Sequence, residues 1–134
     1  MASMSRARLQ LALAVALVLP VGGCVAAAAA AGAGAGIYLT SQGAESLVKS
    51  SVSDVASRAQ AVMKAEGIVE DASSSEAAGD KRELKGKKGD LDITIKMARE
   101  DDATSRVEVT ARKNLAEWDK KYAQQLLSRI VQQS

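Results

Sequence analysis

The chain has 134 residues, with 18 basic and 16 acidic side chains and a formal net charge of +2. It contains no histidine and a single cysteine, which excludes an internal disulfide, the common transition-metal ligand sets and the usual Ser-His and Cys-His nucleophile pairs. We therefore predict a protein that has no metal site and no cofactor and is not an enzyme.

The start of the chain has the composition of a secretory signal peptide. Arg6 and Arg8 precede an apolar run at residues 9–19, and Pro20 with small residues follows it. A positively charged start, an apolar core of about 7–15 residues and a small-residue exit are the three parts of such a signal. The sequence therefore predicts export, with residues 1–23 removed as the signal peptide.

The only cysteine comes directly after this segment. Val21, Gly22, Gly23 and Cys24 resemble the bacterial lipobox, in which an aliphatic residue and two small residues precede a cysteine that is acylated and becomes the new N-terminus. The resemblance implies a palmitate-type lipid anchor on Cys24 and a place in the bacterial cell envelope. Val25 favours the outer membrane, with the protein facing the periplasm, and an inner-membrane anchor is the alternative.

Three other interpretations apply to the same residues. Cleavage within residues 26–31, which offer several A-x-A sites, would release a soluble protein. An uncleaved membrane helix would contain Pro20 and five glycines, a poor composition for a span of about 20 residues. A buried free thiol at Cys24 is disfavoured, because an unpaired thiol is a liability in an oxidising compartment.

The mature chain would be small and electrically neutral. Loss of Arg6 and Arg8 with the signal leaves 16 basic residues against 16 acids. A nucleic-acid-binding surface needs a net basic charge, so we predict no nucleic-acid partner. Residues 24–43 comprise the acylated cysteine and a stretch rich in alanine and glycine, which predicts a tether, with insertion into the membrane surface as the alternative. Residues 44–134 have the size of one small domain.

The domain begins with a predicted amphipathic helix at residues 46–66. Apolar residues recur there at spacings of three and four, which places them on one stripe of a helix. Gly67 follows the last of them, where a left-handed C-terminal cap is expected. The stripe consists of Val48, Val52, Val55, Ala59 and Val62.

Strands are predicted in the middle of the chain. Apolar residues alternate with polar ones at 91–97 and at 107–111, which indicates antiparallel strands with one buried face. Weaker patterns predict a short strand at 68–71, a polar loop at 71–80 and a strand at 81–88. Turns are expected at 89–90 and 100–103.

The last element is a predicted helix that opens at Asn114, with Glu117 three residues on in the spacing of a capping box. Its apolar stripe would be Leu115, Trp118, Tyr122, Leu126 and Ile130. The predicted fold is therefore α+β: a two-layer sandwich in the order α-β-β-β-β-α. An antiparallel meander of three to four strands would carry both helices on one face.

Three motifs were considered for chemistry. Ser46 and Lys49 match S-x-x-K, but the S-D-N and K-T-G companions are absent from the sequence. Asp90 and Asp92 have the spacing of a carboxylate pair on one side of a strand, but nothing apolar surrounds them, so a solvated sheet face is the better interpretation. Residues 100–102 are acidic but lack the spaced ligands of a calcium loop and predict a polar turn.

One run of charge stands out. It contains Lys81, Arg82, Lys85, Lys87 and Lys88, interrupted by one acid. The structural interpretation is a solvent-exposed hairpin, whose lysines disfavour pairing of the sheet edge with another strand. The functional interpretation is contact with an anionic lipid or lipopolysaccharide surface, to which a tether would already hold the domain.

The whole order of features resembles a known group. A signal and lipobox, an alanine- and glycine-rich stretch, the segment Gly36-Ile37-Tyr38 with Gly43, a valine-striped helix and a β-meander are similar to an uncharacterised family of small bacterial lipoproteins, a domain of unknown function. The resemblance implies location and architecture, and it supplies no catalytic residue. The expected protein is a membrane-anchored, non-catalytic structural or binding module, with an unidentified protein as a possible partner. The alternatives are a soluble or inner-membrane-anchored periplasmic protein, or an enzyme that uses acidic residues.

Overall fold

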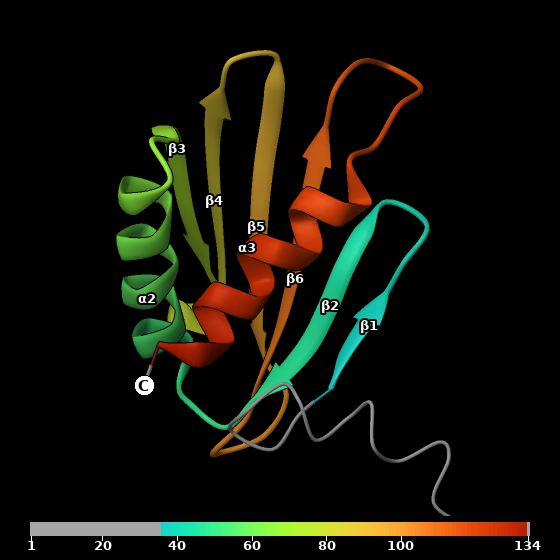
Figure 1. Ribbon diagram of the computed structural model, residues 1–134. Helices are drawn as coiled ribbons and strands as arrows, with labels where there is room; N and C mark the ends of the chain where they lie inside the picture. The colour runs from blue at the N-terminus through green and yellow to red at the C-terminus, as the bar shows by residue number, and fades with distance from the viewer. Residues whose placement is uncertain (1–35, 134) are drawn as a thin grey trace, which may run out of the picture.

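The computed structural model describes residues 36–133. These residues form a six-stranded antiparallel sheet with two α-helices on one face (Figure 1). The α+β class is therefore confirmed, and the expectation of three to four strands is wrong. The elements in chain order are β1 (Ile37–Leu39), β2 (Gly43–Val48), α2 (Val52–Ala65), β3 (Val69–Glu76), a 3-10 turn (Ala77–Gly79), β4 (Lys81–Lys88), β5 (Leu91–Arg99), β6 (Ser105–Arg112) and α3 (Lys120–Gln132).

The strands lie in the order β1-β2-β6-β5-β4-β3. After β2 the chain crosses along α2 to the far edge of the sheet, and the meander β3 to β6 then returns strand by strand until β6 pairs with β2. α3 runs back across β6 and β2, whereas α2 covers β4 and β5 (Figure 1). The two helices therefore divide one face of the sheet between them, and the other face stays open.

The core follows from the alternation along the strands. In the central row across the sheet, Ala44, Val109, Ile95 and Leu84 are cross-strand neighbours, and all four are fully buried. The next residue in that row is Ser73 of β3, which is exposed. The apolar face thus ends at β4, and the edge strand β3 lies outside the cover that the helices provide.

The helix α2 begins later than the sequence pattern indicates. Ser51 is its N-cap, and its hydroxyl accepts a hydrogen bond from Asp54 N at 3.1 Å. The predicted first turn, residues 46–48, belongs instead to strand β2. Val48, the last residue of β2, lies four residues before Val52, the first residue of α2. This spacing matches that of a helical stripe, so the end of the strand was assigned to the helix. The predicted end is confirmed, because Gly67 follows the helix with φ +73.

Two stretches that were predicted to be tether and loop also form strands. β1 and Gly43 of β2 come from the predicted tether, so the sheet begins earlier than residue 44. β3 extends to Glu76 through most of the predicted loop at 71–80, with a bulge between Glu70 and Ala72. All eight β3 residues are exposed. An edge strand with no buried face needs no alternation of apolar and polar residues. The serine-rich sequence of β3 therefore predicted a loop instead of a strand.

The last helix begins at Lys120 rather than near Asn114. Asp119 is the N-cap and accepts a hydrogen bond from Tyr122 N at 2.9 Å. Before it, Trp118 forms a bridge back to Arg112, so residues 113–118 close a loop instead of a helical turn. The predicted stripe is therefore wrong at Leu115, which is 89% exposed, and at Trp118, and is correct at its last three positions.

Neither α-helix of the described chain is long and apolar enough to cross a membrane.

Opposite faces of β5 give the two-layer arrangement a direct test. Ile95 is fully buried, whereas Thr94 lies on the open face between Lys85 and Thr110. Ile95→Asp would bury an unpaired carboxylate and should lower the free energy of unfolding by more than about 3 kcal/mol. Thr94→Asp should change it by less than about 1 kcal/mol. Urea titration of both variants measures this, and equal losses would mean that both faces are covered.

Candidate functional site

The predicted lipid-attachment residue and its motif lie outside the described residues. Cys24 and the lipobox positions Val21, Gly22 and Gly23 precede Gly36, the first described residue, as do residues 25–35 of the predicted tether. The structure therefore bears on the domain that this segment would carry.

The predicted basic run is divided between the two faces of the sheet. It lies in β4, where successive side chains point to opposite sides. Lys81, Lys85 and Lys87 share the open face. Arg82 and Lys88 alternate with them, on the side of the buried Leu84. Strand geometry thus separates five cations that are adjacent in sequence, and they do not form one patch.

Two of the open-face lysines are matched by acids. Lys85 Nζ lies 3.0 Å from Glu83 Oε1, and Lys87 Nζ lies 3.8 Å from Asp92 Oδ1. Exposed pairs of this kind contribute about 0–1 kcal/mol to stability, but they lower the net positive field of the strand. Lys81 makes no ion pair among residues 36–133.

On the helix side, Lys88 belongs to a contact that joins three elements. Its Nζ lies 3.7 Å from Glu66 Oε2 and 5.3 Å from the ring centre of Tyr122. Glu66, at the end of α2, also pairs with Arg129 of α3. The contacts of Lys88 therefore link the sheet to both helices. Arg82, the other cation on this side, has a buried Nε without a hydrogen-bond partner among the described residues.

The paired-acid and S-x-x-K motifs do not form sites. Asp90 lies in the β4–β5 turn, and Asp92 pairs with Lys87 in open solvent. Ser46 is fully buried in β2, where its hydroxyl donates to the Gly36 carbonyl oxygen at 3.1 Å. Lys49 follows the strand and is exposed. Both motifs are accounted for by strand and turn geometry.

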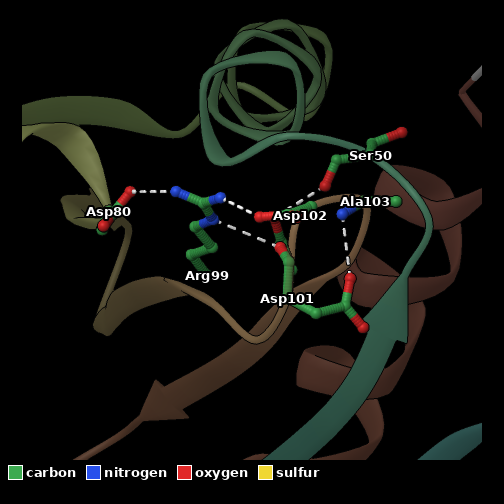
Figure 2. Close-up of polar contacts among 7 residues, drawn as sticks. Ser50, Asp80, Arg99, Asp101, Asp102 and Ala103 are labelled. Carbon is green, nitrogen blue, oxygen red and sulfur yellow. Dashed lines mark hydrogen bonds and ion pairs between the residues drawn. The ribbon is translucent and has the colours of Figure 1, made fainter.

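The acidic turn between β5 and β6 is held by a different partner at each carboxylate. Figure 2 shows Arg99 between Asp102 of this turn and Asp80, which directly precedes β4: its Nη1 lies 3.5 Å from Asp80 Oδ1, and its Nη2 pairs with Asp102. Asp101 Oδ1 accepts a hydrogen bond from Ala103 N at 2.9 Å, which lowers the pKa of Asp101. The acidic side chains of this turn are therefore engaged in contacts within the domain. Within residues 36–133 no cluster of three or more acids could hold a metal.

The open face of the sheet carries a hollow of about 300 Å³. Its floor is formed at Ala98, a small residue that lies between Lys81 of β4 and Arg106 of β6 in the cross-strand register. The long charged neighbours rise around this small side chain, and the difference in length creates the hollow. Its charged side chains come from four strands: Glu76, Lys81, Glu83, Lys96, Arg106 and Glu108.

Arg106 fixes one wall of the hollow. Its guanidinium donates to both carboxylate oxygens of Glu100, Nη2 to Oε1 at 3.0 Å and Nε to Oε2 at 3.1 Å, and it also pairs with Glu45 of β2. The hydrogen bonds raise the pKa of Arg106 and lower the pKa of Glu100 below its ordinary value. Bidentate pairing gives this wall a defined geometry.

A row of three acids and one lysine crosses the rest of the face. Glu45, Glu108, Lys96 and Glu83 are successive cross-strand neighbours on β2, β6, β5 and β4. Lys96, Glu83 and Glu108 also line a second hollow of about 280 Å³, which reaches Trp118. The open face therefore presents charges of both signs, held in register by the sheet, over two adjoining hollows.

From the sequence, these residues were predicted to face solvent, but each strand was considered separately, so their arrangement on one common face was not predicted. The signal that could have found the face is the recurrence of charged or polar residues on the side opposite the apolar ones, at every second position of β4 and β6 and at most such positions of β5. Cross-strand register, which decides which charges become neighbours, required the fold.

Comparison of the chain with protein-family models, curated proteins and solved structures finds no match. Function is therefore inferred from the predicted lipobox, the open face and the exposed surfaces of the domain.

The Glu100–Arg106 pair predicts an acid dependence of stability. Because the folded pKa of Glu100 is lowered, its contribution is fully present above its ordinary pKa and is lost as the pH falls through the lowered value. The stability gap between wild type and Glu100→Gln should thus be largest near neutral pH and should close below about pH 4.5. Urea titration from pH 7 to pH 3 measures it.

Asp71→Asn is the matched control, because Asp71 is an exposed acid that makes no ion pair among residues 36–133. It removes one negative charge without removing an ion pair. If the gap for Glu100→Gln stays constant with pH, the pair with Arg106 does not stabilise the fold.

Proposed function

We propose that this protein is a bacterial envelope lipoprotein, anchored through Cys24, whose α+β domain is a non-catalytic binding module. The segment Val21 to Cys24 supports the anchor. The observation that supports the binding role is the open face of the sheet, with its hollow of about 300 Å³ and its fixed charges of both signs.

The open face suits a folded protein partner with complementary charges. Lys96 lies between Glu108 and Glu83 in the register, and Arg106 is already held by two acids. Such a surface has little net charge, so it favours a partner with a matching arrangement of charges over a uniformly charged polymer. Complementary charge patterns give specificity and fast association more than affinity.

A non-catalytic role is supported by the residue types. The chain has no histidine. The described carboxylates with a shifted pKa, Glu100 and Asp101, are lowered by hydrogen-bond donors and therefore remain ionised near neutral pH. A general acid would need the opposite shift.

Contact of the basic run with anionic lipid or lipopolysaccharide is a weaker proposal. Three of its cations, Lys81, Lys85 and Lys87, share the open face, and acids pair with the last two. The separation of Arg82 and Lys88 onto the helix side reduces the charge that any one surface could meet.

Anchoring is tested by replacing the predicted lipid-attachment residue. Stable membrane attachment takes more than a single acyl chain, and lipoprotein processing supplies several on one cysteine. Cys24→Ala should therefore move the protein from the membrane fraction to the soluble fraction and abolish incorporation of labelled fatty acid. Ser41→Ala, in the β1–β2 turn, is a control that should stay in the membrane fraction. A wild-type protein that takes up no fatty acid would refute the anchor.

Binding through the open face is tested by site-directed crosslinking in the native envelope. A cysteine at Ala98 would carry a thiol-reactive photocrosslinker into the hollow, because acylation removes the native thiol. Gln124→Cys, on the exposed side of α3, is the matched control. Crosslinks to another protein should form from position 98 and be absent or weaker from position 124. Equal yields at both positions, or none at either, would argue against the open face as the binding surface.

A further inference from the structure

Three of the exposed large hydrophobic side chains lie toward one edge of the sheet, and two of them, Tyr38 and Leu39, are adjacent in β1 and point to its opposite faces. Among the described residues, four large hydrophobic side chains are exposed: Tyr38 at 63%, Leu39 at 61%, Val69 at 70% and Leu115 at 89%. Val69 lies on β3, at the far edge of the sheet. The other three lie on β1 and on the loop 113–118 that joins β6 to α3.

These two segments adjoin. β2 pairs with β6 from Gly43 opposite Thr110, so the β1–β2 turn lies beside the end of β6. Gln42 of that turn and Trp118 of the loop line the same hollow. Figure 1 shows the β1–β2 turn and the loop after β6 at the same side of the molecule, away from α2 and β3. We refer to Tyr38, Leu39 and the loop 113–118 as the β1 corner.

The loop is built to hold Leu115 in solvent. Arg112 donates from Nε to the Asn114 carbonyl oxygen at 2.9 Å and from Nη2 to the Leu115 carbonyl oxygen at 3.3 Å. The same guanidinium lies over the ring of Trp118, 5.5 Å from its centre. Asn114 Oδ1 accepts hydrogen bonds from the backbone N–H groups of Ala116 and Glu117, both at 3.0 Å. A loop closed this tightly cannot fold its leucine back into the core.

The loop and the start of α3 carry a small excess of basic side chains. Lys113, Lys120 and Lys121 are exposed, and with Arg112 they outnumber the two acids of residues 112–121, which leaves a net charge of +2. The acids of this segment are used locally: Glu117 lies 3.7 Å from Lys113, and Asp119 caps α3. An exposed aliphatic tip beside these basic side chains matches a lipid surface, where the tip enters the headgroup region and the lysines meet anionic groups.

The position of the N-terminus identifies which lipid surface is near. The chain enters the domain at Ile37, the first residue of β1, so the corner contains the strand that the anchor would lead into. Eleven residues separate Cys24 from Gly36. Such a segment spans at most about 40 Å when fully extended, so the acyl chains and the corner can engage one membrane together.

We propose that the β1 corner docks on the anionic lipid surface in which Cys24 is anchored, with Leu115 inserted among the headgroups. This inference rests on the proposed lipid anchor. It places membrane contact on the β1 corner, whereas the sequence alone pointed to the basic run of β4.

The test uses the acylated protein reconstituted in vesicles of phosphatidylethanolamine and phosphatidylglycerol. Leu115→Cys provides a unique free thiol for an environment-sensitive fluorophore, because Cys24 is occupied by lipid. Val69→Cys is the matched control, since it replaces an equally exposed apolar residue at the opposite sheet edge. The label at position 115 should show a blue-shifted emission and be quenched by nitroxide-bearing lipids, and the label at position 69 should show neither effect.

A second variant tests the class of lipid. Lys113→Glu combined with Lys121→Glu, in the Leu115→Cys background, should abolish the blue shift on these vesicles while the protein still floats with them. A shift that survives the charge reversal would overturn the anionic partner. If the protein floats with the vesicles but the emission of the label at position 115 is no more blue-shifted than that of the label at position 69, the docking is refuted and the anchor stands. Protein that does not float at all would overturn the anchor, and the docking with it.

Discussion

The fold depends on one apolar row that crosses the middle of the sheet. Ala44, Val109, Ile95 and Leu84 are neighbours on four strands, and none of them is exposed. Burying these side chains requires cover, and the sheet can be covered only by the two helices that precede and follow the meander. Because side chains alternate along each strand, the same register that aligns this row also aligns Glu45, Glu108, Lys96 and Glu83 on the opposite face. The open face is therefore a direct consequence of the core.

This coupling explains which parts of the fold the sequence could predict. β5 and β6 alternate strictly because each has one buried and one solvated face, so both were predicted close to their observed positions. β3 has no buried residue and β1 has three residues, so neither carries a hydrophobic period. The strands missing from the prediction are β1 and β2: β1 lies in the predicted tether, and the end of the interior strand β2 was taken as the first turn of the helix, whereas β3 was predicted only at 68–71.

The candidate site shows a similar limit. A run of cations in sequence indicates a basic patch only if the backbone keeps the side chains together, and a strand separates them. Arg82 and Lys88 thus leave the surface that Lys81, Lys85 and Lys87 share. The loop at 113–118 was missed for a different reason: Asn114 and Glu117 do interact, with Nδ2 3.2 Å from Glu117 Oε2, but they close a turn that the Arg112–Trp118 bridge prevents from becoming helical. The local contact between Asn114 and Glu117 was predicted correctly. The helix predicted to open there was wrong, because the segment is closed by the tertiary bridge between Arg112 and Trp118 and forms a loop.

The two proposed surfaces meet at the second hollow, which Trp118 of the β1 corner lines, but the hollow around Ala98 lies farther along the sheet. β1 and β4 are four strand spacings apart in the order β1-β2-β6-β5-β4-β3, a distance of about 20 Å at the usual spacing between strands. The hollow around Ala98 is bordered by β3, β4, β5 and β6, whereas the β1 corner lies at the other edge. A domain that rests on lipid through Leu115 would therefore keep the hollow clear of the headgroups. The membrane contact would also restrict rotation of the domain about its anchor, so that the open face meets a partner in a limited set of orientations. Part of the orientational cost of association would then be met before the partner arrives.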